Sequence, residues 1–205
     1  MGDDSNLYVL AAPSGAGKTT LVKKLVERNP DLKFSISYTT RRKRRTERDG
    51  VDYLFVDKAR FDELKSAGEL LESAEVFDNF YGTSRTQVSE LLAAGHDVML
   101  EIDWQGARQV RESMPDSVSI FILPPSLAEL ERRLRDRRTD DEAVIERRLR
   151  DAVSDMSHWD EFDHVIINDD LEQAVRDLEA VIRGNGGGSS TRNVALRRAV
   201  SRIVG

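Results

Sequence analysis

Residues 7–20 read LYVLAAPSGAGKTT, and this stretch predicts the fold class of the chain. The run from Leu7 to Ala11 is short and apolar, which is typical of a strand buried in a parallel sheet. Gly15 and Gly17 then allow a tight turn in which the backbone can approach a ligand closely. From Lys18 onward apolar residues recur at helical spacing, so the stretch predicts a strand, a glycine-containing loop and a helix start.

The loop and the helix start together predict a phosphate site, because backbone N–H groups and the positive end of the helix dipole point to one place. Lys18 adds a cation for the β- and γ-phosphates, and Thr19 adds a hydroxyl placed to bind Mg²⁺. The pattern is G-x-x-x-x-G-K-[ST], with Ala12 in place of the first glycine. The residues expected around the phosphates are Ser14, Gly15, Ala16, Gly17, Lys18, Thr19 and Thr20. The competing interpretation is an ordinary glycine-rich turn with a surface lysine.

The composition bounds the class of protein. A length of 205 residues suits one domain with a sizeable core, and a net charge of −6 predicts no general attraction for nucleic acids. The chain has no cysteine, which excludes disulfides, thiolate metal sites and cysteine nucleophiles. No apolar run approaches the ~20 residues that cross a bilayer, and the acidic N-terminus is unlike a secretory signal. We therefore expect a soluble, cytoplasmic protein.

Strands alternate with helices along the chain, which predicts an α/β fold with a parallel sheet covered by helices and ligands at the carboxyl ends of the strands. Strands are expected at 31–40, 51–57, 69–77, 98–103, 118–123 and 163–168, with a turn at 78–83. Helices are expected at 59–67, 84–94, 105–112, 127–150 with a break near 138–140, 152–162 and 171–183.

The same pattern divides the chain into parts. Residues 1–183 form the main domain, with a core at about 1–36, 84–126 and 151–183, a small strand-rich insertion at about 37–83 and a helical lid at about 127–150. Residues 184–190 predict a flexible linker. Residues 191–205 form a basic tail, for which disorder and docking on a partner subunit or an acidic surface both stay open.

Two carboxylates end the strand expected at 98–103. Burying Glu101 and Asp103 is costly unless cations or hydrogen-bond donors satisfy them. Beside a phosphate-binding loop, Asp103 is the natural carboxylate for a metal ion, reached through water, and Glu101 points to the same face of the strand. The alternative is a pair of carboxylates that face solvent at a loop.

Two basic clusters complete the candidate site. Residues 41–45 could form a nucleic-acid or targeting patch, or a clamp for a substrate phosphate, and Tyr53 and Tyr81 in the same insertion favour the clamp. The arginines between 132 and 150 suit a mobile lid, because a phosphoryl group in transfer carries spread negative charge. For any single arginine there, a solvated face or an i,i+4 ion pair is the alternative.

Taken together, the motifs resemble those of the guanylate kinase family. They are SGAGKT at 14–19, SYTTR at 37–41, GVDY at 50–53, FYGT at 80–83, LEIDWQG at 100–106 and VIINDD at 165–170. The resemblance runs from about Leu7 to Arg183 and leaves out the tail. It implies a P-loop fold, Mg²⁺ as cofactor and the reaction ATP + GMP ⇌ ADP + GDP.

The resemblance also implies roles for single residues. The GMP phosphate would be held by Arg41, Arg44, Tyr53 and Tyr81, and guanine would be read by Ser37, Glu72, Thr83 and Glu101. Arg133, Arg137 and Arg148 would reach the transferring phosphate, and Asn168 would lie near the adenine of ATP. Lys18 and Arg41 would also act in catalysis, with Thr19 and Asp103 at the metal.

Some positions depart from the family pattern. Besides Ala12, the chain has Arg42-Lys43-Arg44 where the family usually has Thr-Pro-Arg, and Arg45-Thr46-Glu47 where it usually has Pro-Gly-Glu. Arg138 replaces a common glycine of the lid. Two other functions therefore stay open: a binding module without catalysis, and a kinase for another phosphorylated acceptor such as a ribose bisphosphate. Neither a membrane nor a nucleic-acid partner is expected, and the tail is a candidate contact in a homo-oligomer.

Overall fold

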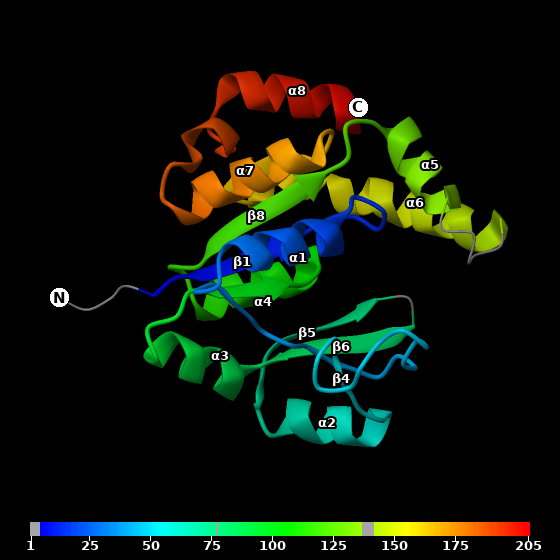
Figure 1. Cartoon of the computed structure of the whole chain (residues 1–205). Coiled ribbons are helices and arrows are strands. Elements are labelled where there is room, and N and C mark those ends of the chain that lie inside the picture. The colour runs from blue at the N-terminus through cyan, green and yellow to red at the C-terminus, as the bar shows by residue number, and fades with distance from the viewer. Residues whose placement is uncertain (1–4, 77, 137–141) are drawn as a thin grey trace. The chain divides into compact units, whose positions relative to one another are not determined.

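The computed structural model describes residues 5–76, 78–136 and 142–205, and Figure 1 shows their helices and strands. The chain forms two compact units. The first unit contains Met1–Val9 and Pro30–Val118, and the second contains Leu10–Asn29 and Ser119–Gly205. This division cuts across the predicted core, so each unit is described by itself. None of the helices in the described ranges is long and apolar enough to cross a membrane.

The first unit holds parallel strands of the kind that the sequence predicts. β2 (Lys33–Phe34) pairs in parallel with β7 (Val98–Glu101), and β7 has β1 (Leu7–Ala11) as its other neighbour. Val98, Met99 and Leu100 are almost fully buried, which is why this strand reads as a continuous apolar run. Helices α3 (Arg85–Ala93) and α4 (Trp104–Ser113) follow the strands of this unit in the chain.

A second sheet in the first unit lies within the predicted insertion. Its strand order is β4 (Leu54–Phe55), β3 (Tyr38–Thr39), β6 (Asn79–Ser84) and β5 (Leu70–Val76). Phe61 and Leu64 of helix α2 (Lys58–Ser66) form a small core with Leu70 of β5. In Figure 1 α2 lies along one side of this sheet.

Two sequence predictions in this region are corrected. The single strand expected at 31–40 is two short strands, because β2 pairs with β7 while β3 pairs with β4 and β6. The turn expected at 78–83 is the strand β6, antiparallel to β5 and to β3. Only Asp78 keeps a turn conformation, with a φ of 63°. Pairing on both edges outweighs the turn-like composition of β6.

The second unit is built on β8 (Val118–Leu123) and β9 (His164–Ile167), which pair in parallel with Ile120 opposite His164. The helices α1 (Lys18–Arg28) and α7 (Leu171–Ile182) contact each other. The predicted helical lid region contains α5 (Leu127–Asp136) and most of α6 (Glu142–Met156). The parallel strands and flanking helices confirm the predicted α/β class.

The end of the chain differs from the predicted linker and tail. The structure continues from α7 through the 3₁₀ turn η2 (Gly186–Ser189) into α8 (Val194–Val204). A Cβ on the buried Gly186 would lie 2.8 Å from both His164 Cε1 and Val181 Cγ2, so this glycine permits close packing. Thr191 Oγ1 donates to the carbonyl of Phe162 at 2.8 Å. A glycine-rich composition therefore serves packing here rather than an extended linker.

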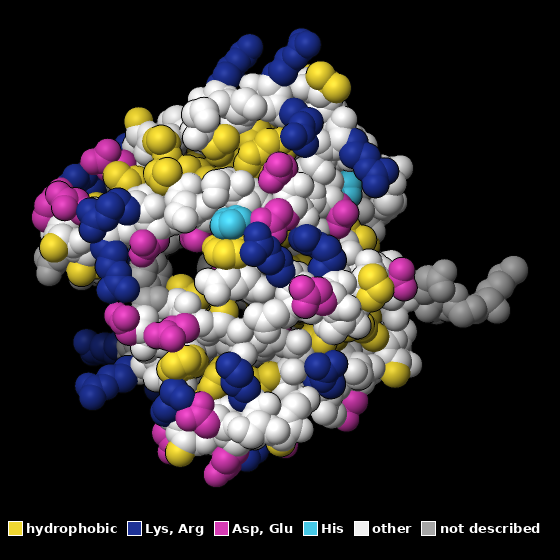
Figure 2. All heavy atoms as spheres, turned by 180° about the vertical axis from the view of Figure 1, so that it is seen from behind, with side chains coloured by type: hydrophobic (Ala, Val, Ile, Leu, Met, Phe, Trp, Pro, Cys, Tyr) yellow, Lys and Arg dark blue, Asp and Glu magenta, His cyan; other side chains and the backbone are white. Residues whose placement is uncertain are grey.

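Helix α8 packs on its own unit. Val200 is fully buried, and the Arg197 guanidinium lies 4.9 Å from the ring centroid of Trp159 in the 3₁₀ turn η1 (Trp159–Glu161). Figure 2 shows Lys and Arg side chains projecting at the upper edge of the view, where Figure 1 draws α8. The helix thus has an apolar side buried within the chain and a basic side exposed.

Candidate functional site

In the second unit, a glycine-containing loop joins β1 to α1. Gly15 and Gly17 have φ values of 93° and 89°, a left-handed conformation that side chains rarely adopt. The N–H of Ala16 donates to the carbonyl of Pro13 at 3.2 Å, which closes the turn. Gly17 is the N-cap of α1 and, as glycine, supplies no side chain to cap the helix. The loop therefore has the backbone form of an anion site at a helix N-terminus.

The predicted loop residues lie where the sequence places them. Lys18 is the first residue of α1, and the exposed Thr19 and Thr20 follow in its first turn. A Cβ on Gly15 would lie 2.9 Å from Leu130 Cδ1 of α5, so both the backbone angle and the packing require glycine there.

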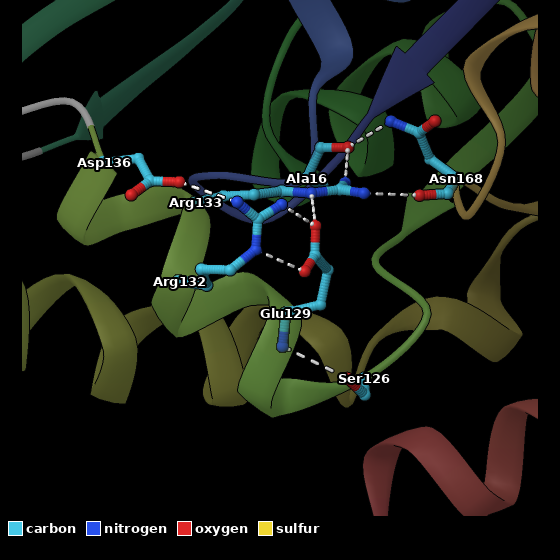
Figure 3. Close-up of polar contacts among 7 residues, drawn as sticks. All are labelled: Ala16, Ser126, Glu129, Arg132, Arg133, Asp136 and Asn168. Atoms are coloured by element: carbon cyan, nitrogen blue, oxygen red, sulfur yellow. Dashed lines mark hydrogen bonds and ion pairs between the residues drawn. The ribbon is translucent and has the colours of Figure 1, made fainter.

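Asn168 and Arg133 both contact the backbone of this loop. Asn168 follows β9, is only 5% exposed, and its Nδ2 donates to the Ala16 carbonyl at 2.7 Å. Arg133 Nη1 donates to the same carbonyl at 3.4 Å, and Arg133 Nη2 donates to the Asn168 carbonyl at 3.0 Å. Figure 3 shows the two side chains converging on Ala16. The structure therefore brings together three of the residues predicted for ATP and the phosphoryl group.

Glu129, which lies one turn before Arg133 in α5, holds the Arg133 side chain. The sequence did not lead us to predict a role for Glu129. Glu129 Oε1 accepts from Arg133 Nε at 2.8 Å, and the same carboxylate accepts from Arg132 (Figure 3). Hydrogen bonds from Arg132 and then Arg133 lower the pKa of Glu129 to about 2, so it is a carboxylate at neutral pH. The i,i+4 spacing of Glu129 and Arg133 is the sequence feature that could have predicted this ion pair.

The other arginines of the predicted lid region have different surroundings. Arg135 pairs with Glu131 and with Glu142, which is the ion-pair alternative considered for single arginines. Arg148 is half-buried on α6. Arg137 lies outside the described residues, as does Arg138.

In the first unit, Arg41 is held by a carboxylate that the sequence reasoning did not assign a role. Its guanidinium makes two hydrogen bonds to Glu47, Nη2 to Oε1 at 2.7 Å and Nη1 to Oε2 at 3.1 Å. It also lies 5.3 Å from the ring centroid of Tyr53. Burial alone would raise the pKa of Glu47, but the hydrogen bonds and charge of Arg41 and Arg44 lower it overall. Arg44 itself is exposed.

The remainder of the basic stretch is a solvated face, since Arg42, Lys43 and Arg45 are exposed. Tyr53 and Tyr81 pack edge to face with centroids 6.1 Å apart. Burial, followed by the charge of Glu101, raises the pKa of Tyr53 to about 12. The Tyr53 phenol therefore stays neutral, and able to donate a hydrogen bond, far above neutral pH. Arg41, Tyr53 and Tyr81 thus lie close together.

A buried carboxylate lies on the second sheet of the same unit. Glu72 of β5 is 3% exposed, and Thr83, opposite it on β6, donates from Oγ1 to Glu72 Oε1 at 2.7 Å. Ser37 is also buried, at 9% exposure. Burying a carboxylate is costly unless donors satisfy it, so this position is built for hydrogen bonding.

Helix α4 contributes residues to this region that the sequence reasoning missed. A Cβ on Gly106 would lie 2.5 Å from Glu72 Oε2, so glycine is required for α4 to approach the carboxylate. Gln109 exchanges two hydrogen bonds with the backbone of Ser73, at 2.9 and 3.0 Å, and so fixes α4 beside β5. Gly106 falls inside the quoted motif at 100–106, but nothing in the sequence indicated its contact with Glu72.

The two carboxylates predicted at the end of β7 lie in different local structures. Glu101 is the last residue of that strand and is half-buried. Asp103 is the N-cap of α4, and its Oδ1 accepts from the N–H of Gly106 at 2.8 Å. Capping gives Asp103 a structural partner that the prediction of a metal-side carboxylate did not include.

Comparisons with known proteins agree with one family. The family model described as guanylate kinase matches residues 4–185. The chain is 50% identical to a guanylate kinase of Pseudomonas fluorescens (strain Pf0-1) over 199 residues, which cover 97% of each chain. It is 56% identical to a guanylate kinase of Chromohalobacter salexigens over 176 residues, covering 86% of this chain and 82% of the relative. It is also similar to the crystal structure of guanylate kinase from Anaplasma phagocytophilum, with a TM-score of 0.76, 36% identity, and 98% and 95% of the two chains covered.

Proposed function

The chain belongs to the guanylate kinase family, and on that premise we propose that it transfers the γ-phosphate of ATP to GMP or dGMP, giving ADP and GDP. A bond forms between a GMP phosphate oxygen and the γ-phosphorus, and the bond from that phosphorus to the β,γ-bridging oxygen breaks. The attacking oxygen is already anionic near neutral pH, so no strong general base is needed. Positioning and charge stabilisation carry the catalysis.

The buried pair of Glu72 and Thr83 is the observation that carries the choice of acceptor. Guanine presents N1–H and N2–H₂ donors side by side, and one carboxylate can accept both. Adenine lacks both donors and would leave the buried carboxylate of Glu72 with fewer hydrogen bonds than guanine supplies. A site built on such bonds discriminates by roughly 10⁴ or more. We assign guanine to Glu72 and Thr83, with Ser37 and Glu101 as further contacts.

The phosphate of GMP is assigned to Arg41, Arg44, Tyr53 and Tyr81. Arg41 supplies a planar fork that matches phosphate oxygens, and Tyr53 supplies a neutral phenol. The ion pair with Glu47 supports this role, because the carboxylate keeps the guanidinium in place before a phosphate arrives.

The triphosphate of ATP is assigned to the loop of the second unit, Ser14 to Thr20. Lys18 supplies a cation from the first turn of α1, and Arg133 contacts the same loop from α5. Arg148 and Arg137 complete the proposed set that neutralises the phosphoryl group in transfer.

We propose Mg²⁺ as the cofactor. Thr19 would supply a hydroxyl oxygen, and Asp103 would supply a carboxylate oxygen. Both are ligands of the kind that Mg²⁺ prefers. Bound with ATP, the ion neutralises phosphate charge. A cytoplasmic location and a homo-oligomer with the C-terminal tail as a contact also remain proposals. Because Val200 is buried within the chain, the exposed residues of α8, among them Arg198 and Arg202, are the ones available for such a contact.

The test is ADP production from MgATP with GMP, dGMP, AMP, UMP or ribose 1,5-bisphosphate as acceptor, with Lys18→Ala as control. Turnover with GMP and dGMP alone, lost in the control, is the expected result. Turnover with ribose 1,5-bisphosphate and not with GMP would show that the acceptor is the sugar phosphate rather than a guanine nucleotide. A folded protein without turnover on any acceptor would favour a binding module.

A further inference from the structure

The Ala16 carbonyl of the glycine-containing loop is the meeting point of a buried network. It accepts from Asn168 Nδ2 at 2.7 Å and from Arg133 Nη1 at 3.4 Å (Figure 3). The Asn168 bond is short and shielded from water, since this side chain is 5% exposed. Such a bond constrains geometry more than an exposed one, because water cannot readily replace a donor that is lost from a buried position.

Asn168 is itself held firmly enough to position the loop. Its backbone N–H donates to the Leu123 carbonyl at 2.7 Å, which continues the pairing of β8 with β9. Its carbonyl accepts from Arg133 Nη2 at 3.0 Å, and Glu129 fixes Arg133 from the other side. The side-chain amide therefore projects from a rigid strand end toward the loop.

Holding the Ala16 carbonyl also sets the direction of the next N–H group. The peptide bond is planar and trans, so the carbonyl of Ala16 and the N–H of Gly17 point in opposite directions. With the carbonyl turned to Asn168, the Gly17 N–H points away from it. Gly17 is the N-cap of α1, where N–H groups and the helix dipole favour an anion.

Packing at this point leaves no room for a side chain on Gly17. A Cβ on Gly17 would lie 2.5 Å from Asn168 Nδ2 and 4.0 Å from Arg133 Nη1. The loop thus needs glycine at position 17 for two reasons, its φ of 89° and the presence of the Asn168 amide.

We propose that Asn168 is a positioning residue for the triphosphate: it holds the Ala16–Gly17 peptide in the orientation that binds phosphate oxygens, whatever base the nucleotide carries. This proposal rests on the proposed function. It differs from the role implied by the family resemblance, in which Asn168 lies near adenine. A residue that reads adenine affects ATP alone, whereas a residue that shapes the loop affects every ligand with a polyphosphate.

The experiment compares Asn168→Asp and Asn168→Ala with the wild type. Asn168→Asp keeps the shape of the side chain but replaces the donor with a carboxylate facing a carbonyl, and Asn168→Ala removes the side chain. Dissociation constants are measured by calorimetry for ATP, CTP and inorganic tripolyphosphate, which has no base. We expect all three to weaken by the same factor, about tenfold, as for the loss of one buried hydrogen bond. The dissociation constant for GMP should stay within twofold.

Asn29→Ala is the matched control, because the Asn29 amide also donates to a backbone carbonyl, that of Leu25 at 2.8 Å, but at the other end of α1. It should lower the melting temperature without changing tripolyphosphate binding. A loss confined to ATP, with tripolyphosphate binding unchanged, would overturn the proposal in favour of base recognition. Equal weakening of GMP would show general unfolding and would also overturn it. Failure of the proposed function is separate, because it would appear as a wild type without GMP-dependent ADP production.

Discussion

The Glu72 carboxylate shows how one residue defines an acceptor. It is almost fully buried, accepts from Thr83, and lies where any side chain on Gly106 would collide with it. A carboxylate in such a position is stabilised only by donors, and guanine supplies two of them.

Glu72→Gln should therefore lower kcat/KM for GMP by about 100-fold, because a charged acceptor is replaced by an amide that presents a donor to a donor. The dissociation constant for ATP should stay within twofold. Steady-state kinetics and calorimetry measure the two effects. Glu75→Gln, at an exposed position of the same strand, is the control and should have no effect. Equal losses for GMP and ATP would contradict the assignment.

Tyr53 gives a prediction on pH. Burial and the charge of Glu101 raise its pKa to about 12, against about 10 in an unfolded chain. The folded state thus holds the phenol proton more tightly, and the resulting stability is complete below pH 10 and is lost as pH rises toward 12. Tyr53 should account for about 1 kcal/mol of the free energy of unfolding lost between pH 9 and pH 11.

Urea unfolding of Tyr53→Phe at the two pH values checks this, since the variant should lose its share of the pH dependence. Tyr8→Phe is the control, because the pKa of Tyr8 is also raised to about 12, by burial and by Asp97. It should remove a similar share of the pH dependence without weakening GMP binding. If Tyr53→Phe kept the full pH dependence of the wild type, the Tyr53 phenol would not be its source.

Among the elements, the helices are the best predicted from local sequence. Asp57, Ser84, Asp103 and Asp170 each accept a backbone N–H as the N-cap of the helix that follows. Capping depends on residues close in sequence, so helix starts can be read locally. The strand β6 could not be read in this way, because a strand is defined by its pairing: β5 directly precedes it in the chain, but its other partner, β3, lies far earlier.

Helix α8 is an element that the sequence did not predict clearly, because both disorder and docking stayed open for residues 191–205. Removing residues 191–205 would remove the contacts made by Val200, Thr191 and Arg197 and would expose the surface that they cover. We expect a loss of about 2–4 kcal/mol in the free energy of unfolding, from apolar burial, one hydrogen bond and one cation–π contact. Chemical unfolding of the truncated chain measures it, with Arg198→Ala as control. An unchanged free energy of unfolding would mean that the tail is not packed in solution.

At the scale of the whole molecule, the residues proposed for the two substrates belong to different units. The loop, Arg133 and Asn168 are in the second unit, and Glu72, Thr83, Arg41 and Tyr53 are in the first. The hydrogen bonds of Asn168 to Ala16 and of Thr83 to Glu72 each lie within one unit. Binding of each substrate can therefore be tested separately from turnover.

Lys18→Ala should lower the turnover number by about 10³-fold or more. The variant lacks the cation that stabilises the negative charge on the phosphoryl group in transfer. It should leave the dissociation constant for GMP within twofold, since Lys18 belongs to the unit that carries the proposed ATP site. Calorimetry with GMP alone and ADP production with both substrates give the two values. A large loss of GMP affinity would argue against this separation.

The sequence by itself determined the α/β class, the glycine-containing loop, most helices and the family, because these depend on residues that are close in the chain or on motifs of fixed spacing. The tertiary structure alone decided the pairing of β6, the packing of α8, the partnership of Arg41 with Glu47, and the contact of Asn168 with Ala16. The last of these joins residues 152 positions apart. The Asn168 contact and the packing of α8 form only when distant segments pack together, and the Arg41–Glu47 pair depends on how the loop between the two residues folds, so no local pattern of residue types reports them.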